Sequence, residues 1–235
     1  MRADLQKYSV ISSPRLFCSF KGMRLKYRYQ DLQLGEYQVR LRVPINLDEA
    51  FARQDRVPGI SREAFPLFGI LWASSEVLAC LMLEEDIGER RFLEVGCGLG
   101  LASLVLRLRG ADVTAMDIHP LAEDLLAANL SLNACRSIPF AARSWSDEDL
   151  DLGSFDLVIG SDILYEPKHS SRLPAFLDRH IAPGGQALIV DPDRGQLDQF
   201  QAEMDARGFS SESWAPEFVD HLDTPYLGKV CRFSR

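Results

Sequence analysis

From Arg91 to Arg207 short apolar segments alternate with longer amphipathic ones, and this alternation restricts the fold more than any other feature of the sequence. Strands are predicted at 92–95, 112–116, 138–143, 155–160 and 187–190, and helices at 101–108, 121–132, 171–181 and 197–207. Apolar strands connected in this way form mostly parallel sheets that are covered by helices on both faces. The sequence therefore predicts an α/β fold with a doubly wound sheet.

Segments on either side of this region extend the predicted sheet and add a hairpin. Residues 209–214 and 226–233 have strand composition and no helix between them, so we expect an antiparallel pair. Over 23–43 apolar and polar residues alternate, which predicts a β-hairpin with its turn at 31–35. A helix is expected over 66–83, after a connecting loop at 46–65. We expect an N-terminal β-hairpin and connecting segment at 1–63 and an α/β domain at 64–235.

Composition restricts the compartment and the chemistry. The five cysteines among the 235 residues are widely spread and form no CxxC pair, which argues against a disulfide framework and a zinc site. The four histidines lack the spacing of metal ligands. The longest uncharged stretch of the most apolar region, 64–75, is too short for a membrane span, and no apolar signal region follows the N-terminus. We expect a cytoplasmic protein with no bound metal.

Charge is unevenly distributed along the chain. The net charge is −8, which disfavours nucleic acid as a partner. Residues 1–45 nevertheless contain nine lysines and arginines against three acidic residues. Two explanations stay open for this basic segment: a solvated strand face, or a docking surface for an acidic partner.

A glycine-rich loop follows the first predicted strand of the α/β domain. Gly96, Gly98 and Gly100 allow the backbone to turn tightly and to approach a ligand at the carboxyl edge of the sheet. The spacing differs from the dinucleotide fingerprint G-x-G-x-x-G, because Leu101 stands at the last position. Asp117 ends the next strand, where a carboxylate can accept both hydroxyls of a ribose. The alternative role for Asp117 is a cap on the following helix.

Several segments, in this order, resemble the S-adenosylmethionine-binding motifs of class I methyltransferases: Glu94–Gly100, Asp117, Phe155–Asp162 and Ala182–Gly185. The resemblance covers about residues 64–233 and implies a Rossmann-like seven-stranded sheet in the order 3-2-1-4-5-7-6, with the last strand antiparallel. It also implies S-adenosylmethionine as the methyl donor and S-adenosylhomocysteine as the product. The cofactor-binding residues that it implies are Trp72, Glu94, Gly96, Cys97, Gly98, Gly100, Asp117, Ile118, Trp145 and Ser161.

The segment after the fourth strand of this domain resembles a more specific motif. Asp162–Tyr165 is similar to the DxxY of family 16 protein-lysine methyltransferases, whose members modify chaperones and the electron-transfer flavoprotein β-subunit. Asp191–Arg194 is similar to the DPxR of the flavoprotein-modifying branch. Two tryptophans flank the cofactor in that family, so the resemblance places Trp72 at the methionine part and Trp145 at the adenine.

Each of these residues also has a plainer explanation. Trp72 and Tyr165 are of a type that often packs in a core. Cys97 is more simply a small filler of the loop than a nucleophile. Asp147 either binds the adenine amino group or begins a turn.

The chemistry asks for alignment of an amine with an activated methyl group. A lysine amine has a reference pKa of ~10.4, so presenting it uncharged at pH 7 costs about 4.6 kcal/mol unless the site favours deprotonation. We hypothesise that Asp162 orients the amine and assists its deprotonation, while Tyr165 narrows the pocket. The sequence therefore predicts an S-adenosylmethionine-dependent methyltransferase acting on a protein lysine. The alternatives are a small-molecule amine N-methyltransferase and a cofactor-binding module without transfer activity.

Overall fold

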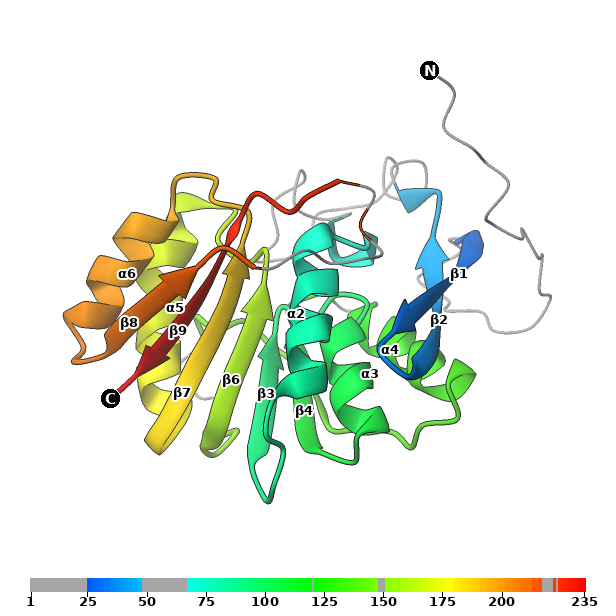
Figure 1. The fold of residues 1–235 in the computed structure, drawn as a ribbon, viewed down its shortest axis with the longest axis horizontal. Helices are drawn as coiled ribbons and strands as arrows, with labels where there is room; N and C mark the ends of the chain where they lie inside the picture. Colours follow the sequence, from blue (N-terminus) through cyan, green and yellow to red (C-terminus); the bar gives the residue numbers. More distant parts are fainter. Residues whose placement is uncertain (1–24, 48–66, 120, 148–150, 217–221, 223) are drawn as a thin grey trace.

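A seven-stranded sheet forms the centre of the protein (Figure 1). The structure is a computed structural model that describes residues 25–47, 67–119, 121–147, 151–216, 222 and 224–235. The strand order is β5-β4-β3-β6-β7-β9-β8, and β9 is antiparallel to both of its neighbours. The α/β class and the predicted order are confirmed. The strands are β3 (Arg91–Val95), β4 (Asp112–Asp117), β5 (Phe140–Ala142), β6 (Phe155–Ser161), β7 (Ile181–Asp191), β8 (Ser210–Trp214) and β9 (Lys229–Ser234).

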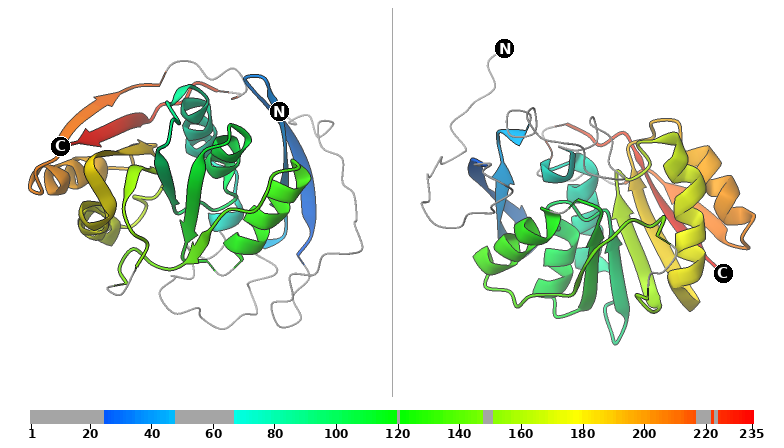
Figure 2. Two further views of the ribbon diagram at one scale, coloured as in Figure 1. Left: turned by 90° about the horizontal axis from the view of Figure 1, so that it is seen from below. Right: turned by 180° about the vertical axis from the view of Figure 1, so that it is seen from behind.

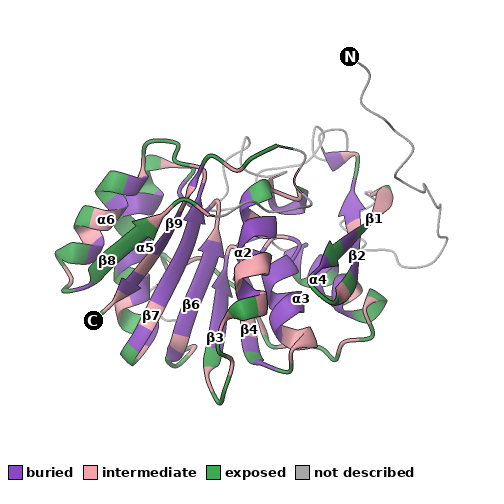
Figure 3. Cartoon of the chain, in the orientation of Figure 1, coloured by how far each residue is buried: buried purple, intermediate pink, exposed green. Residues whose placement is uncertain are grey.

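Helices cover both faces of this sheet (Figure 2). One face packs against α2 (Ala73–Glu84), α3 (Leu101–Leu108) and α4 (Ala122–Leu132), and the other against α5 (Pro167–His180) and α6 (Leu197–Asp205). Neighbouring strand residues point to opposite faces, so Leu188 joins the first apolar cluster and Ile189 the second. The central strands are therefore buried on both sides (Figure 3), which explains their continuous apolar sequence.

The N-terminal hairpin is present, but its turn is shorter than predicted. Strands β1 (Tyr27–Leu34) and β2 (Tyr37–Pro44) are joined by a two-residue turn at Gly35, whose φ is +55°. Of the residues predicted as turn, 31–34 belong to β1, because Asp31 forms an ion pair with Arg40 across the hairpin and Leu32 and Leu34 are buried, whereas Gly35 lies in the turn as predicted. Turn-forming residue types were outweighed here by the apolar contacts of the strand.

The helix predicted over 66–83 begins later than expected. A 3-10 turn, η2 (Leu67–Gly69), comes first, and α2 starts at Ala73. At Gly69 the backbone lies against Pro44 and Leu47, where a Cβ atom would stand 2.7 Å from either side chain. The indole Nε1 of Trp72 donates to the carbonyl of Leu67 at 3.1 Å and holds this non-helical connection in place.

Two asparagines, Asn129 within α4 and Asn133 at its C-cap, attach the hairpin to the rest of the fold. The side chain of Asn133 accepts from the backbone N–H of Arg40 and donates to its carbonyl, both at 2.8 Å. Fully buried Asn129 accepts from the N–H of Arg42 at 2.8 Å and donates to the carbonyl of Leu99 at 2.9 Å. Asn129 thus bridges β2 and the glycine-rich loop.

Replacing Asn129 by alanine is expected to lower the free energy of unfolding by about 3 kcal/mol, because two backbone groups lose a partner that water cannot easily replace. Asn133→Ala is the matched control, since its two bonds to Arg40 are exposed and water can replace them. We expect a cost of about 1 kcal/mol there. Denaturant unfolding measures both, and equal losses in the two variants would contradict the bridging role of Asn129.

None of the helices in the described part of the chain has the length and apolar character needed to cross a membrane. Most of the connecting loop predicted at 46–65 lies outside the described residues. The predicted closing strand at 226–233 begins at Lys229, since Gly228 packs against the carbonyl of Asp191 and the ring of Tyr226.

Candidate functional site

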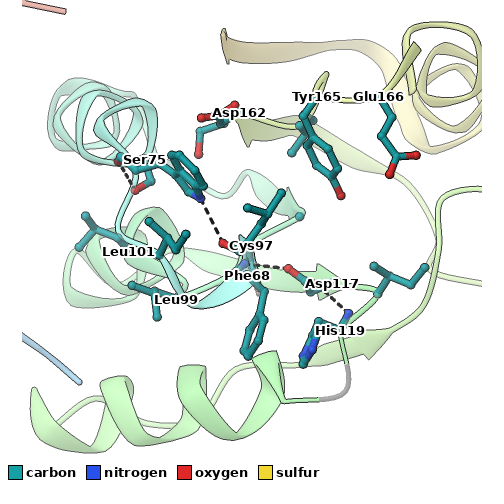
Figure 4. A pocket seen from close by; sticks show the side chains of 18 of the residues that line it. Phe68, Ser75, Cys97, Leu99, Leu101, Asp117, His119, Asp162, Tyr165 and Glu166 are labelled. Carbon is teal, nitrogen blue, oxygen red and sulfur yellow. Dashed lines mark hydrogen bonds between the residues drawn. The ribbon is translucent and has the colours of Figure 1, made fainter. Parts of the chain in front are cut away.

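A cavity of about 420 Å³ opens at the carboxyl edge of the sheet, beyond the ends of β3, β4 and β6 (Figure 4). This volume lies in the range of roughly 300–1,000 Å³ that is usual for small-molecule sites. The structure brings ten of the twelve predicted site residues to its wall. They are Trp72, Gly96, Cys97, Gly98, Asp117, Ile118, Trp145, Ser161, Asp162 and Tyr165.

Asp117 is held by the backbone around it. Its Oδ2 accepts from the N–H of Gly98 at 2.8 Å, and its Oδ1 accepts from the N–H of His119 at 2.7 Å. Helix α4 begins beyond it and has Leu121 at its N-cap position, so the helix-cap alternative does not describe Asp117. The carboxylate is fixed in position at the wall of the cavity.

Glu94 and Gly100 are not among the residues that line this cavity, although the resemblance implied that they bind cofactor. Buried Glu94 accepts hydrogen bonds from the backbone N–H of Ser103, at 2.8 Å, and from the Ser103 hydroxyl. Gly100 adopts φ +71° at the start of α3 and lies against Leu126. Glu94 therefore connects the end of β3 to α3, and Gly100 forms the end of the loop where α3 begins.

Burial raises the pKa of Glu94 to about 7 from an ordinary 4.5, against the opposing effect of the Ser103 bonds. The folded protein therefore holds a proton that the unfolded chain loses between pH 4.5 and 7, so this stabilisation is present at low pH and is lost as the pH rises. We expect the free energy of unfolding to fall by about 3 kcal/mol more over that interval in the wild type than in Glu94→Gln. Urea unfolding at several pH values measures the difference. Asp112→Asn, on the exposed end of β4, should keep the wild-type slope, and identical slopes for wild type and Glu94→Gln would contradict the prediction.

Phe68 and His119 form a part of the wall that sequence reasoning did not include among the site residues. Their rings stack at a centroid distance of 3.5 Å and an angle of 7°. The ring Nδ1 of His119 accepts from the backbone N–H of Leu121, and burial lowers the pKa of His119 to about 3. This wall is therefore uncharged at neutral pH. No periodicity in the sequence relates η2 to the end of β4, so the pair could not be found without the fold.

An aromatic cluster forms another wall. His169 meets the rings of Trp145 and Tyr165 edge-on, at centroid distances of 5.0 and 4.6 Å. Tyr165 is 36% exposed, so the core-packing alternative does not apply to it. Burial raises the pKa of Tyr165 and lowers that of His169, which keeps both rings neutral near pH 7.

Asp162 follows β6 in an uncommon conformation. Its φ is +54°, its backbone N–H donates to the carbonyl of Val190 at 2.9 Å, and its side chain is only 7% exposed. The carboxylate is bound by both terminal nitrogens of Arg194, one of them at 3.1 Å, in a two-pronged ion pair. Arg194 also lies 5.6 Å above the ring of Trp72. The DPxR resemblance was the signal that could have placed Arg194 in the site.

Geometry favours the plainer explanations for Asp147 and Cys97, although Asp147 closes a turn that begins at Ser144 and does not begin one. The carboxylate of Asp147 accepts from the N–H of Ser144 at 3.2 Å within a turn. Cys97 is buried and its thiol pKa is raised by that burial, which suits a filler and not a nucleophile.

Residues 53–234 match the protein family described as the methyltransferase domain. The chain belongs to this methyltransferase family. It is 32% identical over 132 residues to protein N-lysine methyltransferase METTL21A of Danio rerio, covering 52% of this chain and 58% of that protein. It is 31% identical over 137 residues to the electron transfer flavoprotein beta subunit lysine methyltransferase of Danio rerio, covering 57% and 52%. The match thus spans little more than half the length of these relatives.

The fold of this methyltransferase domain is shared with solved structures of the same class. The ribosomal protein L11 methylase from Lactobacillus delbrueckii subsp. bulgaricus superposes with a TM-score of 0.60 at 21% identity, covering 88% of this chain and 99% of that one. Among the described residues of the methyltransferase, no three His, Cys, Asp or Glu side chains gather as metal ligands would.

Proposed function

We propose that this methyltransferase transfers a methyl group from S-adenosylmethionine to the side-chain amine of a lysine in a protein. The observation that carries the proposal is that Asp162 and Tyr165, the two ends of the DxxY segment, line the same cavity as the glycine-rich loop and Asp117. The two relatives described above are lysine methyltransferases by name, which supports lysine as the acceptor.

The residues of the cavity fit an adenosine-bearing cofactor. A Cβ atom at Gly98 would stand 2.7 Å from the carbonyl oxygen of Phe68, so the loop is built for close backbone approach. In our proposal Asp117 accepts the ribose hydroxyls, Trp145 covers the adenine and Trp72 contacts the methionine part. Gly96, Cys97, Ile118 and Ser161 supply further parts of the wall, while Glu94 and Gly100 lie outside the lining and position the loop.

When bound, the cofactor supplies a methyl group activated by its sulfonium. In our proposal the acceptor amine loses its proton to solvent and its lone pair then forms the N–CH3 bond while the S–CH3 bond breaks. S-adenosylhomocysteine is left as product, and the methylated nitrogen carries the charge. Asp162 orients the amine and Tyr165 narrows the pocket, so that the protein contributes alignment and exclusion of water. Solvent takes the proton in place of the assistance by Asp162 that the sequence suggested, because Arg194 already binds the Asp162 carboxylate.

The partner in this proposal is a protein, in the cytoplasm. Widely spread cysteines without a CxxC pair suit a reducing compartment. The hairpin and residues 46–65 are proposed to form part of the substrate entrance, although Arg24 and residues 48–65 lie outside the described residues. In the described hairpin, part of the basic charge has internal contacts, since Arg40 pairs with Asp31 and Arg42 covers the ring of Tyr27 at 3.6 Å. The division at residue 63 stays a prediction.

The test is incubation of the purified protein with methyl-labelled S-adenosylmethionine and a cell extract. The extract is then separated into proteins and small molecules, with excess S-adenosylhomocysteine as the inhibited control. We expect label in a discrete protein band, recovered as methyl-lysine after hydrolysis.

Other outcomes distinguish the alternatives. Label found only among small molecules would favour the small-molecule amine N-methyltransferase. Label recovered as methyl-histidine or methyl-arginine would show that the acceptor residue is histidine or arginine and not lysine. Cofactor binding without any transfer would favour a binding module.

A further inference from the structure

Asp162, which our proposal places next to the acceptor amine, already forms an ion pair within the protein. Asp162 is bound by both terminal nitrogens of Arg194, and both side chains line the cavity. The Asp162 side chain is 7% exposed, whereas that of Arg194 is 45% exposed and reaches Asp162 from the loop after β7. In this ion pair the Asp162 carboxylate is therefore buried, while the Arg194 side chain is in contact with solvent.

This arrangement matters because the reaction needs an amine with a free lone pair. A carboxylate without a cation would stabilise a lysine as its ammonium form, since an opposite charge within a few ångströms favours the charged state. The ammonium has no lone pair and cannot accept a methyl group. An isolated Asp162 would thus bind the substrate well and hold it in the unreactive form.

We propose that Arg194 is a positioning residue that acts through Asp162 and selects the acceptor in its uncharged form. The inference rests on the proposed function and adds to it a device for choosing the protonation state. The guanidinium neutralises Asp162 and leaves a carboxylate oxygen that still accepts a hydrogen bond from a neutral N–H. The proton of the incoming ammonium passes to bulk water.

The other charged and titratable groups around the pair do not replace Arg194. Glu166 is paired with Lys168 at 2.5 Å, and Asp193 with Lys229 at 2.9 Å. Asp191 accepts from the N–H of Asp193, and burial raises the pKa of its carboxyl group.

Two tyrosines complete the surroundings of the pair. The phenol of Tyr226 shares a hydrogen bond of 2.8 Å with the hydroxyl of Ser74, and burial raises the pKa of both Tyr226 and Tyr165. These phenols stay neutral near pH 7. Within the described part of the chain, Arg194 is thus the cation that binds the Asp162 carboxylate.

Selection by charge has a consequence for specificity. An arginine acceptor keeps its charge at every accessible pH and gains nothing from a neutralised carboxylate, whereas a lysine can enter as the free amine. The neutralised carboxylate also gives no extra stabilisation to a bound trimethyl-lysine product, whose positive charge is permanent. Arg194 would therefore favour lysine over arginine and favour release of a fully methylated side chain.

The experiment uses sinefungin, a cofactor analogue with a primary amine where the donor has its methyl group. Dissociation constants for sinefungin and S-adenosylhomocysteine are measured by calorimetry between pH 6.5 and 9. The variants are Arg194→Gln and Arg194→Met, which are uncharged, and Arg194→Lys, which keeps the charge. The affinity for S-adenosylhomocysteine, which has no such amine, reports whether each variant is folded and able to bind.

We expect the wild type to bind sinefungin, relative to S-adenosylhomocysteine, more tightly as the pH rises and the amine loses its proton. In Arg194→Gln and Arg194→Met the unpaired Asp162 carboxylate should stabilise the ammonium form of bound sinefungin and raise the pKa of its amine by about one unit. The affinity for sinefungin relative to S-adenosylhomocysteine at pH 7 should then increase about tenfold and no longer depend on pH, because one unit in pKa corresponds to a factor of ten. Arg194→Lys should behave as the wild type does.

The outcomes separate this inference from the proposed function. An unchanged ratio and pH profile in a neutral variant that binds S-adenosylhomocysteine normally would overturn the role of Arg194 alone. A wild type that binds neither compound would overturn the proposed function, and this inference with it.

Discussion

Alanine at position 98 is expected to weaken the binding of S-adenosylhomocysteine by about 100-fold, which corresponds to roughly 3 kcal/mol. Gly98 has φ +52°, and an L residue in that left-handed region costs roughly 1–2 kcal/mol. The new Cβ would stand 2.7 Å from the backbone oxygen of Phe68, which cannot turn aside as a flexible side chain can. The resulting shift would also move the N–H that Asp117 accepts from.

The matched control is Gly110→Ala. Gly110 has φ +89°, and among the described residues no atom other than those of its chain neighbours lies within 4 Å of the position of its Cβ. This variant should pay a similar conformational cost in stability and bind S-adenosylhomocysteine as the wild type does. Calorimetry on both variants separates damage to the site from general strain. Binding by Gly98→Ala within about threefold of wild type would mean that the loop does not contact the ligand.

Asparagine at position 162 is expected to lower methyl transfer by about 100- to 1,000-fold while cofactor binding stays within about threefold. Asparagine tolerates the φ of +54° and keeps the size of the side chain, so the change removes mainly the charge. It would leave the guanidinium of Arg194 without its counter-ion at the acceptor end. An unpaired cation there repels the positive charge that forms on the nitrogen during transfer.

Asp193→Asn is the control for this experiment. Asp193 also has positive φ, +61°, and also pairs with a cation, Lys229 at 2.9 Å, but it is not among the residues that line the cavity. Its loss should leave the rate of labelling unchanged. Full turnover by Asp162→Asn with cofactor bound would show that the carboxylate is not used in transfer.

Sequence patterns were sufficient for the sheet because its central strands are apolar on both faces and its helices are periodic. The same patterns placed Asp117 and the glycine-rich loop at one edge, since parallel strands end on the same side. The hairpin turn was predicted too long because Asp31, of a residue type that favours turns, lies in β1, where Leu32 and Leu34 are buried and decide the register.

Sequence patterns did not predict the contacts between segments that are distant in the chain. The stacking of Phe68 on His119 joins η2 to the end of β4, and the pairing of Arg194 with Asp162 joins the loops after β7 and β6. A motif can indicate that an arginine is present but not which carboxylate it binds. Glu94 belongs to the glycine-rich motif but does not line the cavity, because its carboxylate accepts from the N–H of Ser103 in the first turn of α3. A motif therefore does not show which of its residues contact the ligand.

The distribution of tryptophan gives the protein an optical reporter of its own. Two of the three tryptophans, Trp72 and Trp145, line the cavity, and the third, Trp214, lies in β8 and is not among the lining residues. A ligand that enters between the first two changes the environment of most of the indole emission, while Trp214 contributes a constant background. Intrinsic fluorescence can therefore follow the filling of this site without any attached dye.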